Sequence, residues 1–137
     1  LLLWAWILSG YAALVVYTNR RRFRGMMPYI TAVLMVTQCF FLILVGFVVS
    51  PFQVLAVGRE VVAVADGAGL NPLLQYWAMV IHPPVLYLGY VGFVVPFAFA
   101  VGSLITRQPG DEWIRTTRRW TLVTWGFQTA GILLGAG

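Results

Sequence analysis

The stretch "YITAVLMVTQCFFLILVGFVVS", residues 29–50, contains no Asp, Glu, Lys or Arg. At a rise of 1.5 Å per residue, this stretch is long enough to cross the roughly 30 Å hydrocarbon core of a bilayer as an α-helix. Backbone N–H and C=O groups in lipid need partners within their own segment, and a helix supplies those partners. The stretch therefore predicts a membrane-spanning helix.

Three other runs repeat this pattern, at residues 1–18, 84–105 and 120–137. Charged residues make up only 9% of the 137 residues, whereas a soluble domain contains about 25%. We therefore expect an all-α fold: a polytopic membrane helical bundle in a single domain, with four transmembrane helices and one short periplasmic surface helix. The first and last runs are expected to be cut short, so the chain is expected to be an internal fragment.

The basic residues indicate the orientation of this bundle. All nine are arginine, and eight of them lie in two connections between runs: "NRRRFRG", residues 19–25, and "TRQPGDEWIRTTRR", residues 106–119. The segment 51–83 carries only Arg59. The positive-inside rule then places both arginine-rich connections in the cytoplasm and the segment 51–83 in the periplasm of a bacterial inner membrane. The net charge of +5 thus reflects membrane topology, and no nucleic-acid partner is expected.

The periplasmic segment ends in a predicted short helix. Asn71 is a favourable N-cap and Pro72 a favourable first residue, so a surface helix is expected over 73–81. A residue before proline is disfavoured in the helical region, so this helix should stop at His82. Pro83 and the following residue can then open the third span. These rules place His82 at an elbow between a surface helix and a spanning helix.

Small residues and one proline predict details of the packing. In "GILLG", Gly131 and Gly135 lie one turn apart and allow another helix to approach closely. Gly89 and Gly92 should narrow the start of the third span in the same way. Pro96 lies inside that span and should kink it.

His82 is the single histidine of the chain, and three kinds of role are open to it. It could be an interfacial imidazole in contact with water, a ligand of haem or another metal, or a proton-transfer group. A zinc site is disfavoured because neither cysteine nor a second histidine is nearby, and the spans lack a carboxylate partner for proton transfer. Aromatic residues precede and follow it, among them Tyr76, Trp77 and Tyr87. Such surroundings suit a large, flat apolar ligand.

Four stretches together resemble one known family. "GLNPLLQ", residues 69–75, is followed by "YWAMVIHPPVLYLGYVGF", residues 76–93. "SPFQVLA", residues 50–56, lies before them, and "RRWTLVTWGFQTAGILLGAG", residues 118–137, lies after them. These stretches resemble the CcmF/NrfE family of cytochrome c-type biogenesis proteins, and the resemblance covers essentially the whole chain.

The resemblance implies a haem-binding subunit of a haem lyase. Such a subunit accepts haem from a periplasmic haem chaperone and, with other lyase subunits, helps attach it to the CxxCH motif of apocytochrome c. His82 matches the family's first periplasmic histidine, an axial haem ligand. Tyr76, Trp77 and Tyr87 are expected to line the haem pocket. The family's tryptophan-rich WWD platform, second periplasmic histidine and two membrane histidines have no match in these residues. No catalytic residue is therefore assigned, and the chain alone is expected to be inactive.

Two other functions are compatible with these patterns. One is haem delivery or transmembrane haem transport by a protein of the same superfamily. The other is a piece of an unrelated secondary transporter, in which Pro96 and the glycines would mark a broken helix. Transporters usually carry polar groups at mid-membrane, whereas these spans offer little beyond Ser9, Thr31, Thr37 and Gln38. A tryptophan cluster after residue 137 would favour haem handling, and an inverted repeat would favour transport.

Overall fold

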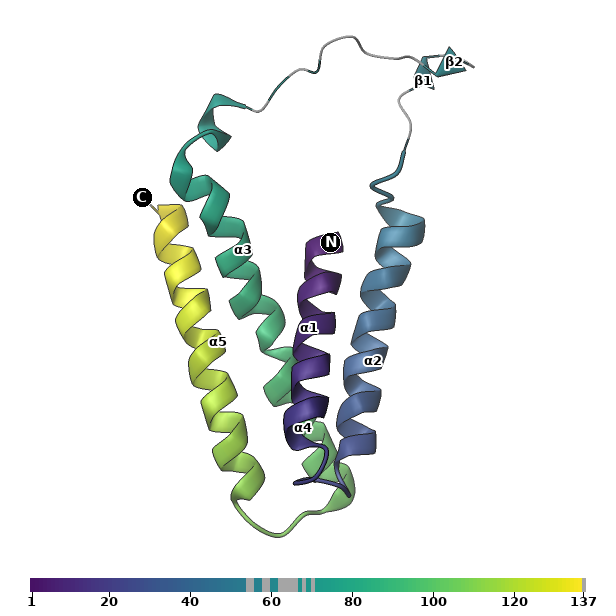
Figure 1. Ribbon diagram of the computed structural model, residues 1–137, viewed down its shortest axis with the longest axis vertical. Coiled ribbons are helices and arrows are strands. Elements are labelled where there is room, and N and C mark those ends of the chain that lie inside the picture. The colour runs from purple at the N-terminus through teal and green to yellow at the C-terminus, as the bar shows by residue number, and fades with distance from the viewer. Residues whose placement is uncertain (54–55, 58–59, 62–66, 68, 70, 137) are drawn as a thin grey trace.

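The computed structural model describes residues 1–53, 56–57, 60–61, 67, 69 and 71–136, and these form an elongated helical bundle (Figure 1). The bundle is all-α as predicted, apart from one antiparallel pair of two-residue strands that aligns Ala56 with Val61 and Val57 with Glu60. In chain order the elements are α1 (Leu2–Asn19), α2 (Met27–Ile43), the π-helix η1 (Leu44–Val48), β1 (Ala56–Val57), β2 (Glu60–Val61), the 3-10 helix η2 (Pro72–Leu74), α3 (Trp77–Gly92), α4 (Val94–Thr106) and α5 (Glu112–Ala136).

Three helical segments of the described chain are long and apolar enough to cross a membrane: Leu2–Asn19, Met27–Val48 and Trp77–Thr106. They confirm the first three predicted spans, although the third begins seven residues before residue 84. Large apolar side chains face outward along them, including Trp6 at 75%, Val36 at 71% and Phe47 at 88% exposure. Such an exterior suits lipid better than water.

The fourth predicted span, 120–137, falls within α5 and stays a prediction. α5 has 25 residues, enough to cross a bilayer. However, α5 contains arginines, threonines and a glutamine. It is not among the described segments that are apolar enough to span a membrane. α5 runs antiparallel to α3 along the bundle, and these two helices form the most extensive interface of the described residues (Figure 1).

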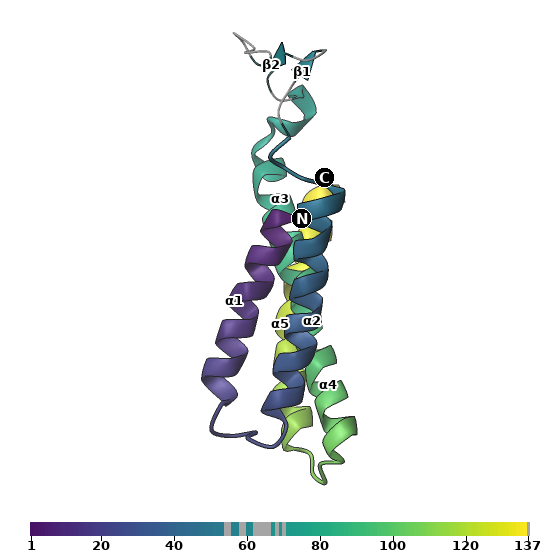
Figure 2. The ribbon, with the colours of Figure 1, turned by 90° about the vertical axis from the view of Figure 1, so that its right-hand side faces the viewer.

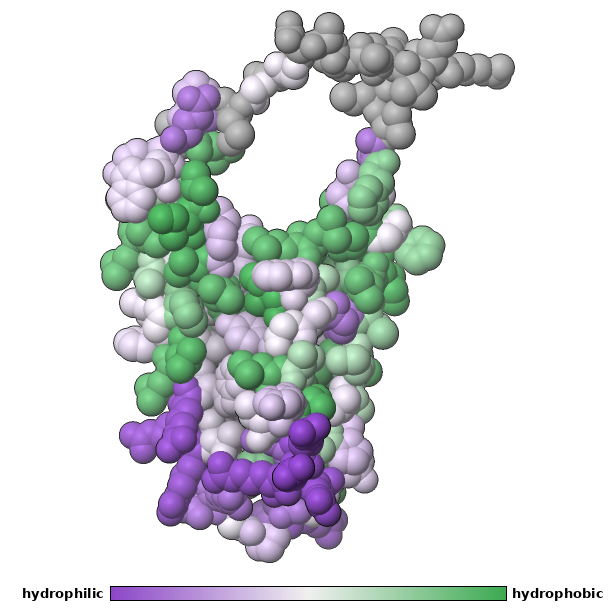
Figure 3. Space-filling model, in the orientation of Figure 1, coloured by the Kyte–Doolittle hydropathy of each residue, from purple (hydrophilic) through white to green (hydrophobic). Residues whose placement is uncertain are grey.

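Both arginine-rich connections lie at the same end of the bundle. Arg22 Nε donates to Glu112 Oε1 over 2.6 Å and so joins the first connection to the start of α5. Figure 3 shows hydrophilic residues gathered at this end and hydrophobic residues above them. The segment between η1 and α3, only part of which is described, lies at the opposite end (Figure 1). The chain therefore has one arginine-rich end, as the sequence predicted.

The predicted separate surface helix over 73–81 is wrong. Pro72–Leu74 form only a 3-10 turn, Tyr76 is extended with φ −69° and ψ 133°, and α3 then runs unbroken from Trp77 through His82 to Gly92. The helix therefore passes through Pro83 and Pro84, where the local preference favours a break. Packing of α3 against α5 on both sides of these prolines explains why the helical backbone persists.

The interruption of the third span lies instead at Phe93, between α3 and α4. Pro96 lacks the N–H that would pair with the carbonyl of Gly92, four residues earlier. The regular helix is interrupted at Phe93, the residue that follows Gly92. α4 then takes a different direction from α3 (Figure 2). The predicted effect of Pro96 thus appears as a break three residues before the proline.

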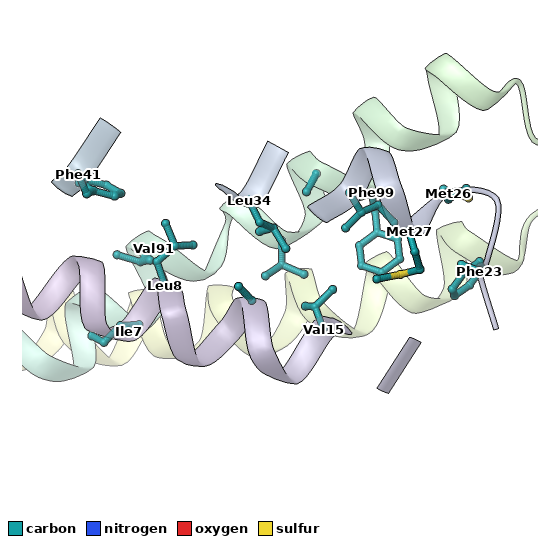
Figure 4. Close-up of a cluster of buried hydrophobic side chains, with 14 of the residues drawn as sticks. Ile7, Leu8, Val15, Phe23, Met26, Met27, Leu34, Phe41, Val91 and Phe99 are labelled. Carbon is teal, nitrogen blue, oxygen red and sulfur yellow. The ribbon is translucent and has the colours of Figure 1, made fainter. Parts of the chain in front are cut away.

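The main core joins α1, α2, α3 and α4, and Figure 4 shows part of it. The fully buried side chains at its centre are Leu8, Val15, Ile30, Leu34 and Phe99. This core extends from Ala5 and Phe41 to Phe23 and Met26 beside the first arginine-rich connection. From α5, Trp113 and Trp120 pack against this core, and the most extensive contact of α5 is with α3. That contact positions the single histidine.

Candidate functional site

His82 lies in the α3–α5 interface against a glycine. A Cβ atom added to Gly135 would fall 2.5 Å from His82 Cε1 and 2.9 Å from Nδ1. One turn along, a Cβ atom added to Gly131 would fall 2.7 Å from the Cα atom of Leu86. Real Cβ atoms essentially never come closer than 3.0 Å to such neighbours. With the imidazole in this position, a Cβ atom at residue 135 would collide with the ring, and "GILLG" is a packing motif as predicted.

The glycines of α3 make the reciprocal contact further along the interface. A Cβ atom at Gly89 would collide with the backbone N of Gln128 and would lie 2.6 Å from its Cα. A Cβ atom at Gly92 would collide with the side chain of Thr124, which is fully buried. The two helices thus meet at glycines from both sides, which fixes their antiparallel register and holds His82 opposite Gly135.

A hydrogen bond fixes the orientation of the imidazole ring. His82 Nδ1 lies 2.6 Å from the carbonyl oxygen of Gly131. A carbonyl oxygen can only accept, so Nδ1 carries the proton and donates. In the neutral ring the lone pair is then on Nε2. Histidines that bind a metal through one ring nitrogen usually donate the other N–H to a carbonyl or carboxylate, which orients the ring and makes the ligating nitrogen more basic.

The three other predicted pocket residues lie in two separate places on the chain's fold. Tyr76 and Trp77 contact each other, with ring centroids 5.8 Å apart, and are 54% and 62% exposed beside the start of α3. Tyr87 lies five residues after His82, which turns its side chain about 140° away on the helix. Its ring packs against Trp4 of α1 at 5.3 Å. Tyr87 is therefore part of the α1–α3 contact, on a different side of α3 from His82.

Two features of this arrangement were not found from the sequence. Trp4 contacts Tyr87, Tyr90 and Phe41 and centres an aromatic cluster of α1, α2 and α3. It lies inside an apolar run, so no local signal distinguished it from lipid-facing residues. The Gly131 carbonyl was also missed, because a backbone acceptor leaves no sequence signal beyond the small residues that let it approach.

The donor set suits one kind of metal better than others. Within the residues that the structure describes, no group of three or more His, Cys, Asp or Glu side chains could enclose a metal ion. A single imidazole with a fixed Nδ1 proton and an Nε2 lone pair matches instead the axial ligand of haem iron, because the porphyrin supplies the other four nitrogens. One imidazole that could serve as an axial ligand is therefore present, and its Nε2 also lies beside Gly135, where an added Cβ atom would be 3.0 Å away.

Comparison with known proteins identifies the relatives of the chain. The family model described as "Cytochrome C assembly protein" matches residues 1–137. The chain belongs to this cytochrome c assembly family. Across 99% of its residues, it is 40% identical to "Cytochrome c-type biogenesis protein CcmF" of Pseudomonas aeruginosa and 38% identical to the protein of the same name from Escherichia coli. It is also 38% identical to "Cytochrome c-type biogenesis protein NrfE" of Haemophilus influenzae.

These matches confirm the family predicted from the "GLNPLLQ" and "HPP" stretches. The chain spans 20% of the length of each of the two CcmF relatives and 21% of the NrfE relative. No solved structure matches the chain significantly. The assembly family and the candidate spans together make the chain part of a bacterial membrane protein of cytochrome c biogenesis.

Proposed function

We propose that His82 is an axial ligand of haem in a membrane protein that acts as the haem-binding subunit of a cytochrome c haem lyase. The observation that carries this proposal is the hydrogen bond of 2.6 Å between Nδ1 and the Gly131 carbonyl. It holds the ring in the tautomer whose Nε2 can bind iron. The family relationship supports haem as the molecule bound, since cytochrome c assembly requires it.

The position of His82 suits haem that arrives from the periplasm. α3 begins at the end of the bundle opposite the arginine-rich connections (Figure 1), and His82 is the sixth residue of this helix. The exposed rings of Tyr76 and Trp77 at the start of the same helix offer flat apolar surface near the site, although Trp77, five residues before His82, lies about 140° from it around the helix. Haem is the group to be transferred, and this chain's contribution is to bind and orient its iron. Tyr87 is not part of this proposal, because it packs against Trp4.

The partners follow from the same proposal. A periplasmic haem chaperone would deliver haem, and apocytochrome c would receive it through its CxxCH thiols. Other haem lyase subunits would hold the two together. The relatives are about five times longer than the chain, so a second axial ligand and the surface that receives apocytochrome c are expected from other parts of the full-length protein.

A change of ligand should be visible in the haem spectrum. The full-length protein carrying His82→Cys should bind haem with the absorption spectrum of a thiolate ligand, because thiolate also ligates haem iron. Val80→Cys is the matched control: Val80 lies two residues away on α3 with 67% of its surface exposed, on another side of the helix. Its haem spectrum should equal that of the parent protein. A parental spectrum for His82→Cys at parental haem content would exclude His82 as an axial ligand.

The orientation of the bundle can be tested by cysteine labelling. In a Cys39→Ser background, Pro109→Cys lies in one arginine-rich connection and Gly67→Cys in the segment between η1 and α3; both positions are exposed. An impermeant thiol reagent added to intact spheroplasts should label Gly67→Cys and should label Pro109→Cys only after lysis. Labelling of Pro109→Cys before lysis would place His82 on the cytoplasmic side and contradict delivery from the periplasm.

A further inference from the structure

A long apolar groove runs between α1 and α5. It consists of two adjoining hollows of about 430 and 380 Å³, which share Tyr11, Leu14 and Leu88. Figure 1 shows α3 between α5 and α1, and Leu88 of α3 forms part of the groove's floor. Tyr11 Oη donates to the carbonyl of Leu88 over 2.7 Å. This bond satisfies the hydroxyl, so the wall there presents mainly hydrocarbon.

The groove is chemically different at its two ends. Val123 and Phe127 of α5 and Trp6 of α1 line its apolar part. At the end near the arginine-rich connections, the lining residues are Arg119 and Trp120. From Arg119 to Phe127 the groove follows α5 for about 12 Å. It therefore combines an apolar groove with a single arginine at the end nearer the arginine-rich connections.

Arg119 is available for an external anion. The salt bridges of the described residues join Arg22 to Glu112 and Arg115 to Asp111, and Arg119 belongs to neither. Its side chain is exposed. The guanidinium of arginine matches phosphate oxygens in a bidentate geometry. An apolar channel that ends at an unneutralised arginine is complementary to an amphiphile with a phosphate head group and a net negative charge.

We propose that this groove binds an anionic phospholipid from the leaflet on the arginine-rich side. One acyl chain lies in the groove against Tyr11, Leu88 and Phe127, and the phosphate contacts Arg119. A zwitterionic lipid can fill the same channel, but it carries no net charge to pair with Arg119. The electrostatic attraction between one arginine and an anionic head group should make the groove prefer anionic over zwitterionic lipid by about fivefold.

Photo-crosslinking in the full-length protein tests this occupant. A photoreactive benzoylphenylalanine replaces Phe127, and the protein is placed in bilayers of equal parts phosphatidylglycerol and phosphatidylcholine. Mass spectrometry of the adducts should show phosphatidylglycerol in about fivefold excess over phosphatidylcholine. Arg119→Gln should reduce this ratio to about one, because it removes the charge that selects the head group.

Arg118→Gln is the matched control. It removes the same charge one residue away. Arg118 lines a separate hollow together with Thr121 and Leu122 and does not line the groove. The lipid ratio at position 127 should remain fivefold in this variant. Three results would overturn the proposal: adducts to another peptide segment of the protein, equal adducts of the two lipids in the parent, or equal losses with Arg118→Gln and Arg119→Gln. None of them depends on haem.

Discussion

The full-length protein carrying His82→Ala should mature cytochrome c at least tenfold more slowly than the parent, at an unchanged amount of protein in the membrane. Loss of the hydrogen-bond partner of a metal ligand typically lowers metal affinity or activity by about 10–100-fold, and loss of the ligand itself should cost at least as much. Alanine removes the Nε2 donor and ends the contact with the Gly131 carbonyl. Holo-cytochrome c, measured by haem staining in cells that depend on the variant, gives the rate.

Alanine at position 82 should not disturb insertion or folding. The ring is part-buried at the edge of the interface, and the glycine contacts at Gly89, Gly92 and Gly131 remain. Added imidazole should partly restore haem binding in the variant, because the missing ring leaves a gap beside Gly135 that a free imidazole can enter. Val80→Ala, at an exposed position of the same helix, should behave like the parent in both assays.

The result would contradict the ligand proposal if His82→Ala matured cytochrome c at the parental rate with an unchanged haem spectrum. His82 would then be an interfacial imidazole that serves only the α3–α5 contact. A variant that lost maturation and also disappeared from the membrane would point to the same structural role, since a ligand alone does not decide insertion.

The sequence predicted the spans well because lipid imposes a simple rule. A run that must satisfy its own backbone hydrogen bonds becomes a helix whatever its detailed composition, so residues 1–18 and 29–50 match α1, α2 and η1 closely. The single imidazole also directed attention to His82, whose role as a haem ligand stays a proposal. These predictions depended on composition, which a sequence displays directly.

The surroundings of His82 could not be predicted in the same way. Local rules for Pro83 and Pro84 favoured a helix break, but the contact of Leu86 and Gly89 with α5 keeps the backbone helical. Tyr87 was placed near His82 because it is close in sequence, although a helix turns side chains five residues apart to different sides. The carbonyl that orients the ring belongs to Gly131. Which helix a glycine motif approaches is a property of the assembled bundle.

Gly89→Ala should disrupt the contact between α3 and α5, and this substitution has the largest expected effect on stability. A Cβ atom at this position would collide with the backbone N of Gln128 and lie 2.6 Å from its Cα. Backbone atoms cannot rotate away as a flexible side chain does, so Gly89→Ala must push the two helices apart. Overpacking of this kind costs about 1–3 kcal/mol. The full-length protein should therefore unfold at a lower temperature in detergent.

Gly126→Ala supplies the matched control, because it lies inside α5 and a Cβ atom there would meet nothing within 4 Å. Both substitutions gain the same helix propensity of alanine over glycine, about 1 kcal/mol, so the difference between their melting temperatures isolates the collision. Gly89→Ala should also weaken haem binding, since separating α3 from α5 lengthens the bond from His82 to Gly131, whereas Gly126→Ala should leave haem binding unchanged. Equal melting temperatures for the two variants would mean that the helices do not meet at Gly89, and the register that places His82 opposite Gly135 would have to be abandoned.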